Sequence, residues 1–318
     1  MLGKIGVIGG GNIGGVLCQE LVRRRLARTV ALMDVAEPAL AEGKCLDIAE
    51  GTPMAGASVK LVGGKGYDVL AGSDLVINTA GVPRKPKPDG SLPSREELLA
   101  INLTITDLVA GGIKAHCPNA IVISIANPLD AIVYRLHQQL DPRKGRLMGM
   151  AGALDSARYR FFVADAIGVS VENVQAMVLG GHGDDMVPIR SACRVAGLPV
   201  QAFLDDATLA KIEDRTRKAG GEVVKLLGTG SAFVSPAWGA IEMTEAIVRD
   251  EKKIIPCCVH LQGEYGVEGT FVGVPVVLGA AGVERIIEID LTDDERAALD
   301  KSVAAVRKTC AEVDSLAG

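Results

Sequence analysis

A glycine-rich turn near the start of the chain constrains the fold more than any other feature. Residues 4–10, KIGVIGG, read as an apolar strand, and the turn continues with Gly9, Gly11 and Gly14 at the spacing G-x-G-x-x-G. The amphipathic stretch over 13–26 then reads as a helix. A strand, a glycine turn and a helix in this order predict the first unit of a doubly wound α/β sheet.

The same turn predicts a dinucleotide site. Gly9 would permit the tight turn, Gly11 would let the backbone approach a pyrophosphate, and Gly14 would allow close packing of helix on strand. Asp34 lies at the end of the next expected strand, twenty residues after Gly14. Its carboxylate would accept hydrogen bonds from the ribose hydroxyls and repel a 2′-phosphate, which favours NAD over NADP. The alternative is a glycine turn that binds nothing, with Asp34 a solvated strand end.

The rest of the first half repeats the alternation of apolar strands and amphipathic helices, and its strands read as apolar on both faces. This predicts a Rossmann-type parallel sheet covered by helices on two sides. The further strands are expected over 29–35, 58–64, 74–81 and 119–128. After about residue 145 the pattern changes, and the apolar runs 254–261 and 269–279 look like an antiparallel pair. We therefore expect a dinucleotide-binding domain over 1–147 and an α+β substrate domain over 148–318.

Composition restricts the class of protein. The chain has 318 residues, 48% hydrophobic and 23% charged, which is typical of a soluble globular protein. The net charge of −5 and the isoelectric point near 5.5 argue against a nucleic-acid or acidic-membrane partner. Because the sequence lacks an uninterrupted run of 18 apolar residues and a secretory leader pattern, we expect a cytoplasmic protein.

The seven cysteines are an odd number without C-x-x-C spacing. They are predicted to be buried residues in a reducing compartment, and no metal site is expected. Cys257 and Cys258 are adjacent, so a redox role for this pair stays open.

Three polar residues in the second half are candidates for chemistry. His182 lies in VLGGHGDDMVPI, where a glycine-flanked turn after an apolar strand would expose its ring. Asp155 and Arg158, in LDSAR, share one face of a predicted helix. These could be a structural histidine and a surface ion pair. Alternatively, Asp155 could orient a histidine while Arg158 grips a substrate carboxylate through two parallel N–H bonds.

Residues 81–102 contain two arginines, Arg84 and Arg95, eleven positions apart and separated by a run rich in proline, lysine and glycine. Two arginines on one loop suggest a site for an anion with two acidic groups.

Five segments together resemble a known family. GVPRK…SREELLAIN, ISIANPLDAIVY, LDSARYR, VLGGHGDDMVPI and GVEGTFVGVPVVLG are similar, in this order, to signature segments of the malate/lactate dehydrogenase superfamily. The resemblance covers essentially the whole chain and is strongest to the lactate-dehydrogenase-like malate dehydrogenases of bacteria.

This resemblance implies a role for each candidate in reversible hydride transfer between (S)-malate and NAD. His182 would be the acid/base, and Asp155 would orient it. Arg158 would anchor the C1 carboxylate, Arg95 would polarise the C2 oxygen, and Arg84 would read the second carboxylate at the specificity position.

The resemblance also implies the remaining contacts and the assembly. Asn127 would touch both substrate and nicotinamide, and Ala232 would occupy a pocket position that is small in malate enzymes. The expected cofactor-binding residues are Gly9, Gly11, Asn12, Ile13, Gly14, Asp34, Thr79, Ala80, Gly81, Asn102, Ile125 and Asn127. A small dicarboxylate substrate, a place in the tricarboxylic acid cycle and a homodimer or homotetramer are implied as well.

Two departures from the family pattern leave alternatives open. The loop between Arg84 and Arg95 is five residues longer than in typical malate enzymes, so a lactate or other 2-hydroxy-acid dehydrogenase with altered specificity is the rival prediction. Asp185 replaces the usual threonine in HGDTM, where it could raise the pKa of His182 or point to solvent. A non-catalytic NAD-binding protein is a more remote alternative, since the candidate catalytic groups are all present.

Overall fold

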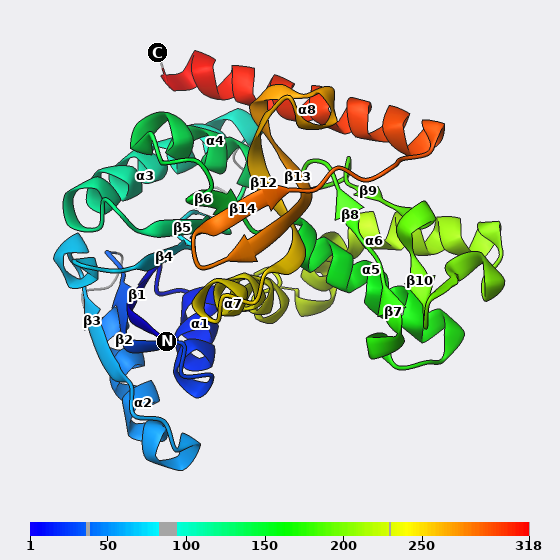
Figure 1. The fold of residues 1–318 in the computed structure, drawn as a ribbon. Coiled ribbons are helices and arrows are strands. Elements are labelled where there is room, and N and C mark those ends of the chain that lie inside the picture. The colour runs from blue at the N-terminus through cyan, green and yellow to red at the C-terminus, as the bar shows by residue number, and fades with distance from the viewer. Residues whose placement is uncertain (36–38, 83–93, 229, 318) are drawn as a thin grey trace.

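The computed structural model describes residues 1–35, 39–82, 94–228 and 230–317, without the side chains of Arg95 and Ala317 (Figure 1). A large mixed sheet contains strands from both halves of the chain, in the order β14-β13-β12-β6-β5-β4-β1-β2-β3. Its strands are β1 (Leu2–Ile8), β2 (Ala27–Met33), β3 (Lys60–Gly64), β4 (Leu75–Asn78), β5 (Ile121–Ser124), β6 (Leu147–Gly149), β12 (Lys253–Gln262), β13 (Glu268–Gly279) and β14 (Gly282–Ile286).

The first six strands are parallel to one another and form the dinucleotide-binding type of sheet that the sequence predicts. Strand β1 lies between β2 and β4, so the order of the strands reverses next to β1. In open α/β sheets the ligand crevice lies at this reversal, outside the carboxyl ends of the strands. The glycine turn follows β1 at that edge.

The two halves of the chain share this sheet. Strands β12 and β13 form the predicted antiparallel pair, with Cys257 opposite Val274, and β12 joins β6 where Cys258 pairs with Gly149. The domain boundary predicted between residues 147 and 148 falls within β6, the strand on which the antiparallel part is added. Strand β14 extends the sheet on the far side of β13.

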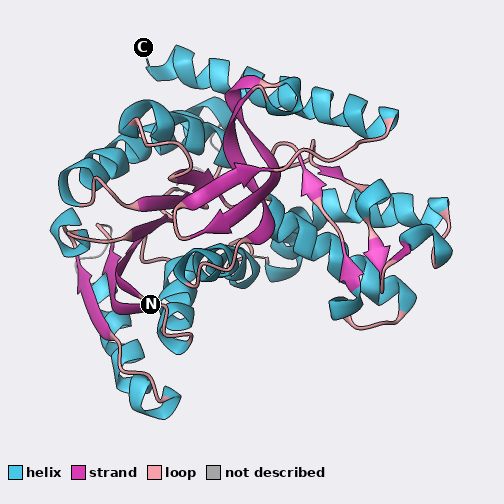
Figure 2. Ribbon diagram, in the orientation of Figure 1, coloured by secondary structure: helices cyan, strands magenta, loops and turns pink. Residues whose placement is uncertain are grey.

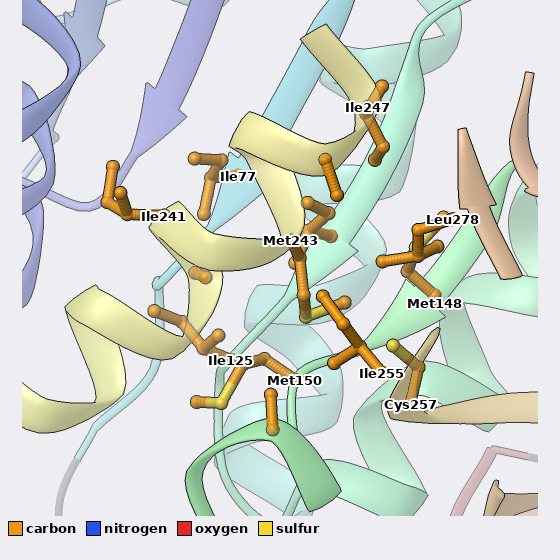
Figure 3. Close-up of a cluster of buried hydrophobic side chains, with 14 of the residues drawn as sticks. Ile77, Ile125, Met148, Met150, Ile241, Met243, Ile247, Ile255, Cys257 and Leu278 are labelled. Carbon is orange, nitrogen blue, oxygen red and sulfur yellow. The ribbon is translucent and has the colours of Figure 1, made fainter. Parts of the chain in front are cut away.

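Helices cover both faces of the sheet, and strand residues alternate between two cores. One face packs against α1 (Asn12–Arg23), α2 (Leu40–Ala55) and α7 (Val234–Val248), and the other against α3 (Arg95–His116) and α4 (Leu129–Leu140). Figure 3 shows Met243 of α7 close to Ile255 of β12, and Ile241 of α7 on the side of Ile77 of β4. This two-sided burial explains why the central strands are apolar throughout.

The rest of the second half stands beside the sheet, as Figure 2 shows. Helices α5 (Gly152–Ile167) and α6 (Asp206–Leu227) pack on short strands, in a third core around Tyr159 and Val174. The predicted strand and loop over 174–189 is divided into short strands. They are β7 (Val174–Gln175), β8 (Val178–Leu179) and β9 (Val187–Pro188), and β10 (Arg194–Val195) and β11 (Leu198–Pro199) follow. The chain ends in α8 (Asp293–Ala317), which packs on α4 and β13.

The seven cysteines are free and buried, which confirms their prediction as buried residues. Cys257 faces the core under α7, whereas Cys258 faces the core under α4. Burial raises the pKa of both thiols. The adjacent cysteines therefore point to opposite sides of β12 and have little thiolate to react with.

Helix α3 begins with a capping box, in which Ser94 and Glu97 each accept a hydrogen bond from the other's backbone N–H. Residues Glu96–His116 are long and apolar enough, by length and composition alone, to cross a membrane. A helix of a soluble protein can pass the same test. The helix packs on α4, and Asp107 on α3 forms a two-pronged ion pair with Arg135 on α4. One side of α3 is therefore held against α4, while Ile101 and Leu108 on α3 stay exposed.

Candidate active site

The glycine turn has the conformation that its sequence predicts. Gly9 adopts φ +100°, where residues other than glycine are strained. An added Cβ on Gly11 would meet no described atom within 4 Å, so the backbone there is open to an approaching group. An added Cβ on Gly14 would collide with the carbonyl oxygen of Gly9. Each of the three positions therefore requires glycine for a different reason. Gly9 has a positive φ, the backbone at Gly11 is open to a ligand, and Gly14 is in close contact with the Gly9 carbonyl oxygen.

The beginning of α1 has the features of an anion site. No described side chain caps this helix terminus, and its first turn contains no acidic residue. The unpaired N–H groups of the first turn and the helix dipole favour a negative charge there. Lys44, on α2, donates to the carbonyl oxygens of Gly10 and Gly11 at 2.6 and 2.8 Å, which adds a positive charge beside the turn. The turn thus fits the pyrophosphate of a dinucleotide.

Asp34 follows β2 and lies beside the turn, as predicted. Its Oδ2 accepts a hydrogen bond from the backbone N–H of Gly10 at 2.5 Å. The carboxylate is partly buried and stands at the carboxyl end of the strand next to β1. This is where the adenosine ribose of a bound dinucleotide lies in such sheets.

The segment after β4 is anchored to the turn. The Thr79 hydroxyl donates to the carbonyl oxygens of Ile8 and Gly9. Asn102, fully buried on α3, accepts from the backbone N–H of Val82 at 2.7 Å and donates to its carbonyl oxygen at 3.2 Å. The amide oxygen and the amide nitrogen of Asn102 thus both bond to the backbone of Val82, near the start of the 81–102 loop. A contact between Asn102 and a cofactor stays a prediction.

The other predicted cofactor residues lie along the same edge of the sheet. Asn12, Ile13, Ala80 and Gly81 follow β1 and β4 and are exposed or partly buried; Ile125 and Asn127 follow β5, the first buried and the second exposed. Their common position at the carboxyl ends of β1, β4 and β5 puts them on the edge of the sheet where the cofactor is predicted to bind.

His182, Asp155 and Arg158 come together in the second half of the chain. The Nδ1 atom of His182 lies 2.8 Å from Oδ2 of Asp155, although 27 positions separate them in the sequence. Nη1 of Arg158 lies 3.4 Å from Oδ1 of the same carboxylate. The Asp155 side chain is 2% exposed, whereas those of His182 and Arg158 are 17% and 15% exposed. A buried carboxylate thus links two partly accessible groups.

This arrangement shifts the protonation of the histidine. Burial acts to lower the pKa of the His182 imidazole, but the charge and hydrogen bond of Asp155, with a smaller contribution from Asp130, outweigh it. The pKa of His182 therefore lies above its ordinary value. Burial also lowers the pKa of the Arg158 guanidinium, and Asp155 opposes this change. Because Asp155 engages Nδ1, the other ring nitrogen is left to exchange a proton with a ligand.

Asp130 is a site residue that the sequence analysis missed. It lies in the first turn of α4, three positions after Asn127, and its Oδ2 accepts the backbone N–H of His182 at 3.1 Å. This bond brings the His182 turn to the carboxyl end of β5, beside the predicted cofactor surface. Burial raises the pKa of Asp130 to about 6. A carboxylate directly after ANPL was the available signal, but only the tertiary fold gives it a partner.

Asp185 faces away from the reacting group. Its side chain is 47% exposed and lies 3.9 Å from Lys301 on α8. Of the two possibilities that the sequence left open, the structure favours the one in which Asp185 points to solvent, because Asp155 and Asp130 carry the charge next to His182.

The roles of the two loop arginines, Arg84 and Arg95, remain predictions. Arg84 lies outside the described residues, and Arg95 begins α3 with a side chain outside the description. Ala232 is partly buried and lies two residues before α7. Among the described residues, no group of three or more His, Cys, Asp or Glu is arranged to hold a metal ion.

Comparison with known families gives two matches that together span nearly the whole chain. Residues 3–149 match the NAD binding domain of lactate/malate dehydrogenases, and residues 152–316 match their alpha/beta C-terminal domain. Malate dehydrogenase 1 of Anaeromyxobacter dehalogenans is 51% identical over 311 residues, 97% of each chain. The malate dehydrogenase of Geobacter sulfurreducens is 50% identical over 98% of each chain.

Solved structures of both substrate types are similar to this fold. The malate dehydrogenase of Salinibacter ruber is 40% identical, with a TM-score of 0.92 over 98% of each chain. The lactate dehydrogenase of Cryptosporidium parvum, solved with lactic acid and nicotinamide adenine dinucleotide, is also 40% identical, with a TM-score of 0.93 over 99% of this chain and 98% of its own. Likeness to these structures therefore does not separate the two substrates, whereas the curated relatives at about half identity carry the malate name.

Proposed function

The chain belongs to the lactate/malate dehydrogenase family, and from this premise we propose that it is an NAD-dependent malate dehydrogenase. It interconverts (S)-malate and oxaloacetate. The observation that carries the proposal is the contact between His182 and the buried Asp155, which supplies a proton-transfer group with a raised pKa beside an arginine. The malate dehydrogenases at 51%, 48% and 50% identity favour malate over lactate.

The first half of the chain holds the cofactor. The open backbone at Gly11, the beginning of α1, where no described side chain forms a cap, and the Lys44 ammonium would receive the pyrophosphate, and Asp34 would receive the adenosine ribose. The cofactor would supply the hydride chemistry, with the oxidised form accepting the C2 hydride of malate and the reduced form donating a hydride to oxaloacetate. Asn102 and Thr79 fix the segment after β4, so the loop that follows starts from a defined position.

His182 moves the proton. In malate oxidation the neutral imidazole takes the proton of the C2 hydroxyl, and Asp155 stabilises the imidazolium that forms. In the reverse direction the imidazolium donates to the ketone oxygen of oxaloacetate, and Arg95 offsets the negative charge that develops there. The raised pKa of His182 favours the imidazolium and therefore suits the reduction of oxaloacetate near neutral pH.

Two arginines bind the two carboxylates of the substrate. Arg158, 15% exposed and facing the site of His182, holds the C1 carboxylate. Arg84 holds the distal carboxylate when the 81–102 loop closes and excludes water. Pyruvate lacks this second group. Leaving Arg84 buried without a partner would cost about 3–5 kcal/mol, which corresponds to roughly a hundred-fold or greater preference for oxaloacetate.

The rival within the family is a lactate or other 2-hydroxy-acid dehydrogenase, which the five extra loop residues would create by moving Arg84 out of the pocket. The specific test is Arg84→Gln, with Lys85→Gln as a control that removes the neighbouring charge. We expect Arg84→Gln to lower kcat/KM for oxaloacetate by about a hundred-fold and Lys85→Gln to change it by less than about three-fold. Full activity of Arg84→Gln would assign the selection of substrate to another loop residue.

We further propose that the enzyme is a cytoplasmic homodimer or homotetramer of the tricarboxylic acid cycle. Large apolar side chains lie exposed on α2, α6 and α7, where Met54, Leu226 and Trp238 are 87%, 79% and 53% exposed. Such surfaces support self-association. Light scattering coupled to gel filtration measures the mass in solution, and a mass of 33.1 kDa, that of one chain, would contradict the oligomer.

A further inference from the structure

Three successive backbone N–H groups of the His182 turn are bonded to three different elements. Gly180 donates to the carbonyl oxygen of Gly273 on β13 at 2.9 Å and accepts in return at 3.0 Å. Gly181 donates to Oγ of Ser302 on α8 at 2.9 Å, and His182 donates to Oδ2 of Asp130 on α4 at 3.1 Å. The turn is thus fixed at every residue up to the histidine, by groups distant in sequence.

The contacts around the two glycines are close. An added Cβ on Gly180 would come within 2.5 Å of Oγ of Ser302, and one on Gly181 within 2.7 Å of Val306, also on α8. Ser302 is fully buried, and Val306 is 4% exposed. Helix α8 is therefore in close contact with the turn. The hydroxyl of Ser302 accepts a hydrogen bond from the backbone N–H of Gly181.

Asp130 is the charged member of this set. The groups that face its partly buried carboxylate are His182, Asp155 and the thiol of Cys258, which donates to Oδ1 at 3.5 Å. Its position in the first turn of α4 adds the favourable end of a helix dipole. One carboxylate oxygen therefore holds the His182 backbone, while the thiol holds the other oxygen in place.

We propose that Asp130 and Ser302 are positioning residues for His182: they hold the backbone of residues 181 and 182 so that the imidazole meets the Asp155 carboxylate. The turn contains glycine at 180, 181 and 183, so it has little conformational restriction of its own. Asp155 fixes the ring, and Asp130 and Ser302 fix the chain that carries the ring. The inference rests on the proposed function of His182, and it makes α8 part of the active site.

The variant Ser302→Ala tests the hydrogen bond between the Gly181 N–H and the Ser302 hydroxyl. We expect kcat for oxaloacetate to fall about 2- to 10-fold, the size of one hydrogen bond, while KM for NADH stays unchanged. Amide hydrogen exchange at Gly181 should become faster. The matched control is Thr244→Ala, which removes another fully buried hydroxyl, bonded to the Ala240 carbonyl oxygen at 2.7 Å on α7. This control should leave kcat and the exchange at Gly181 unchanged.

The variants Asp130→Asn and Asp130→Ala test the hydrogen bond between the His182 N–H and the Asp130 carboxylate. Asparagine keeps an acceptor oxygen but loses the charge, so the pKa of His182, followed by NMR of the imidazole, should fall while kcat changes little at low pH. Alanine removes the acceptor as well, and kcat should fall roughly 10- to 100-fold. Asp185→Asn is the matched control, because it removes an exposed carboxylate from the same turn and should leave the pKa of His182 unchanged.

The proposal is overturned if folded Ser302→Ala and Asp130→Ala proteins keep the wild-type kcat, pH profile and amide exchange at residues 181 and 182. The NMR titration and the exchange need no substrate. A wild-type protein that fails to reduce oxaloacetate, but whose amide exchange at residues 181 and 182 becomes faster in Ser302→Ala and Asp130→Ala, would contradict the proposed function and leave the positioning role standing.

Discussion

Replacing Asp155 by asparagine tests how the structure prepares His182 for proton transfer. The wild-type carboxylate is 2% exposed and lies 2.8 Å from Nδ1 of His182, so it stabilises the imidazolium in a place where water cannot. Asparagine has almost the same shape but no charge. Its amide can also donate to Nδ1, which would favour the tautomer with the proton on the other nitrogen, the wrong one for accepting a proton from malate.

The expected loss follows from the contact. A hydrogen bond to a charged group contributes about 1.5–3 kcal/mol, which corresponds to about a 10- to 150-fold lower kcat. The same free energy corresponds to a pKa of His182 lower by about 1–2 units, at 1.36 kcal/mol per unit. Arg158 loses its negatively charged partner in the same variant, so KM for oxaloacetate should also change.

The assay is initial-rate oxaloacetate reduction with NADH across pH 5–9 in wild type, Asp155→Asn and Asp165→Asn. Asp165 is an exposed carboxylate ten residues further along α5 and makes a matched control on the same helix. We expect the descending basic limb of the Asp155→Asn profile to move to lower pH. A variant with wild-type kcat and an unmoved limb would refute the role of Asp155.

Further variants and one pH profile test the rest of the site. Asp34→Ser should raise kcat/KM for NADP at least about ten-fold over wild type, because it removes the charge that repels a 2′-phosphate. Gly14→Ala should lower the free energy of unfolding by about 1–3 kcal/mol in urea melts, since its Cβ would meet the Gly9 carbonyl oxygen. Arg158→Lys should raise KM for oxaloacetate about ten-fold, because lysine cannot make two parallel bonds to a carboxylate. Because the pKa of His182 is raised, oxaloacetate reduction should fall and malate oxidation rise as pH increases through a midpoint above the ordinary value near 6.5.

The local features of the site could be predicted from the sequence because they rest on short spacings. The turn of Gly9, Gly11 and Gly14 and the position of Asp34 follow from one βαβ unit. The pairing of Asp155 with Arg158 follows from one helical turn. The contact of His182 with Asp155, across 27 positions, was implied by the family resemblance and not by spacing.

The long-range features could not be predicted because nothing local marks them. Ser302 is one small residue in the repeating pattern of a long helix, and Asp130 is one acid in a first turn. Each gains its role from a backbone N–H that the fold brings to it. In the same way, the joining of β12 to β6 depends on tertiary contact, so the sequence predicted two packed halves and not one shared sheet.

The most direct test of the malate assignment is the ratio of kcat/KM for oxaloacetate to that for pyruvate, measured with the wild-type protein and saturating NADH at one pH. The family resemblance and the relatives together predict a ratio of roughly a hundred or more, because only oxaloacetate has a second carboxylate for the role proposed for Arg84. A ratio below one would contradict the assignment and make the chain a dehydrogenase of lactate or another monocarboxylic 2-hydroxy acid.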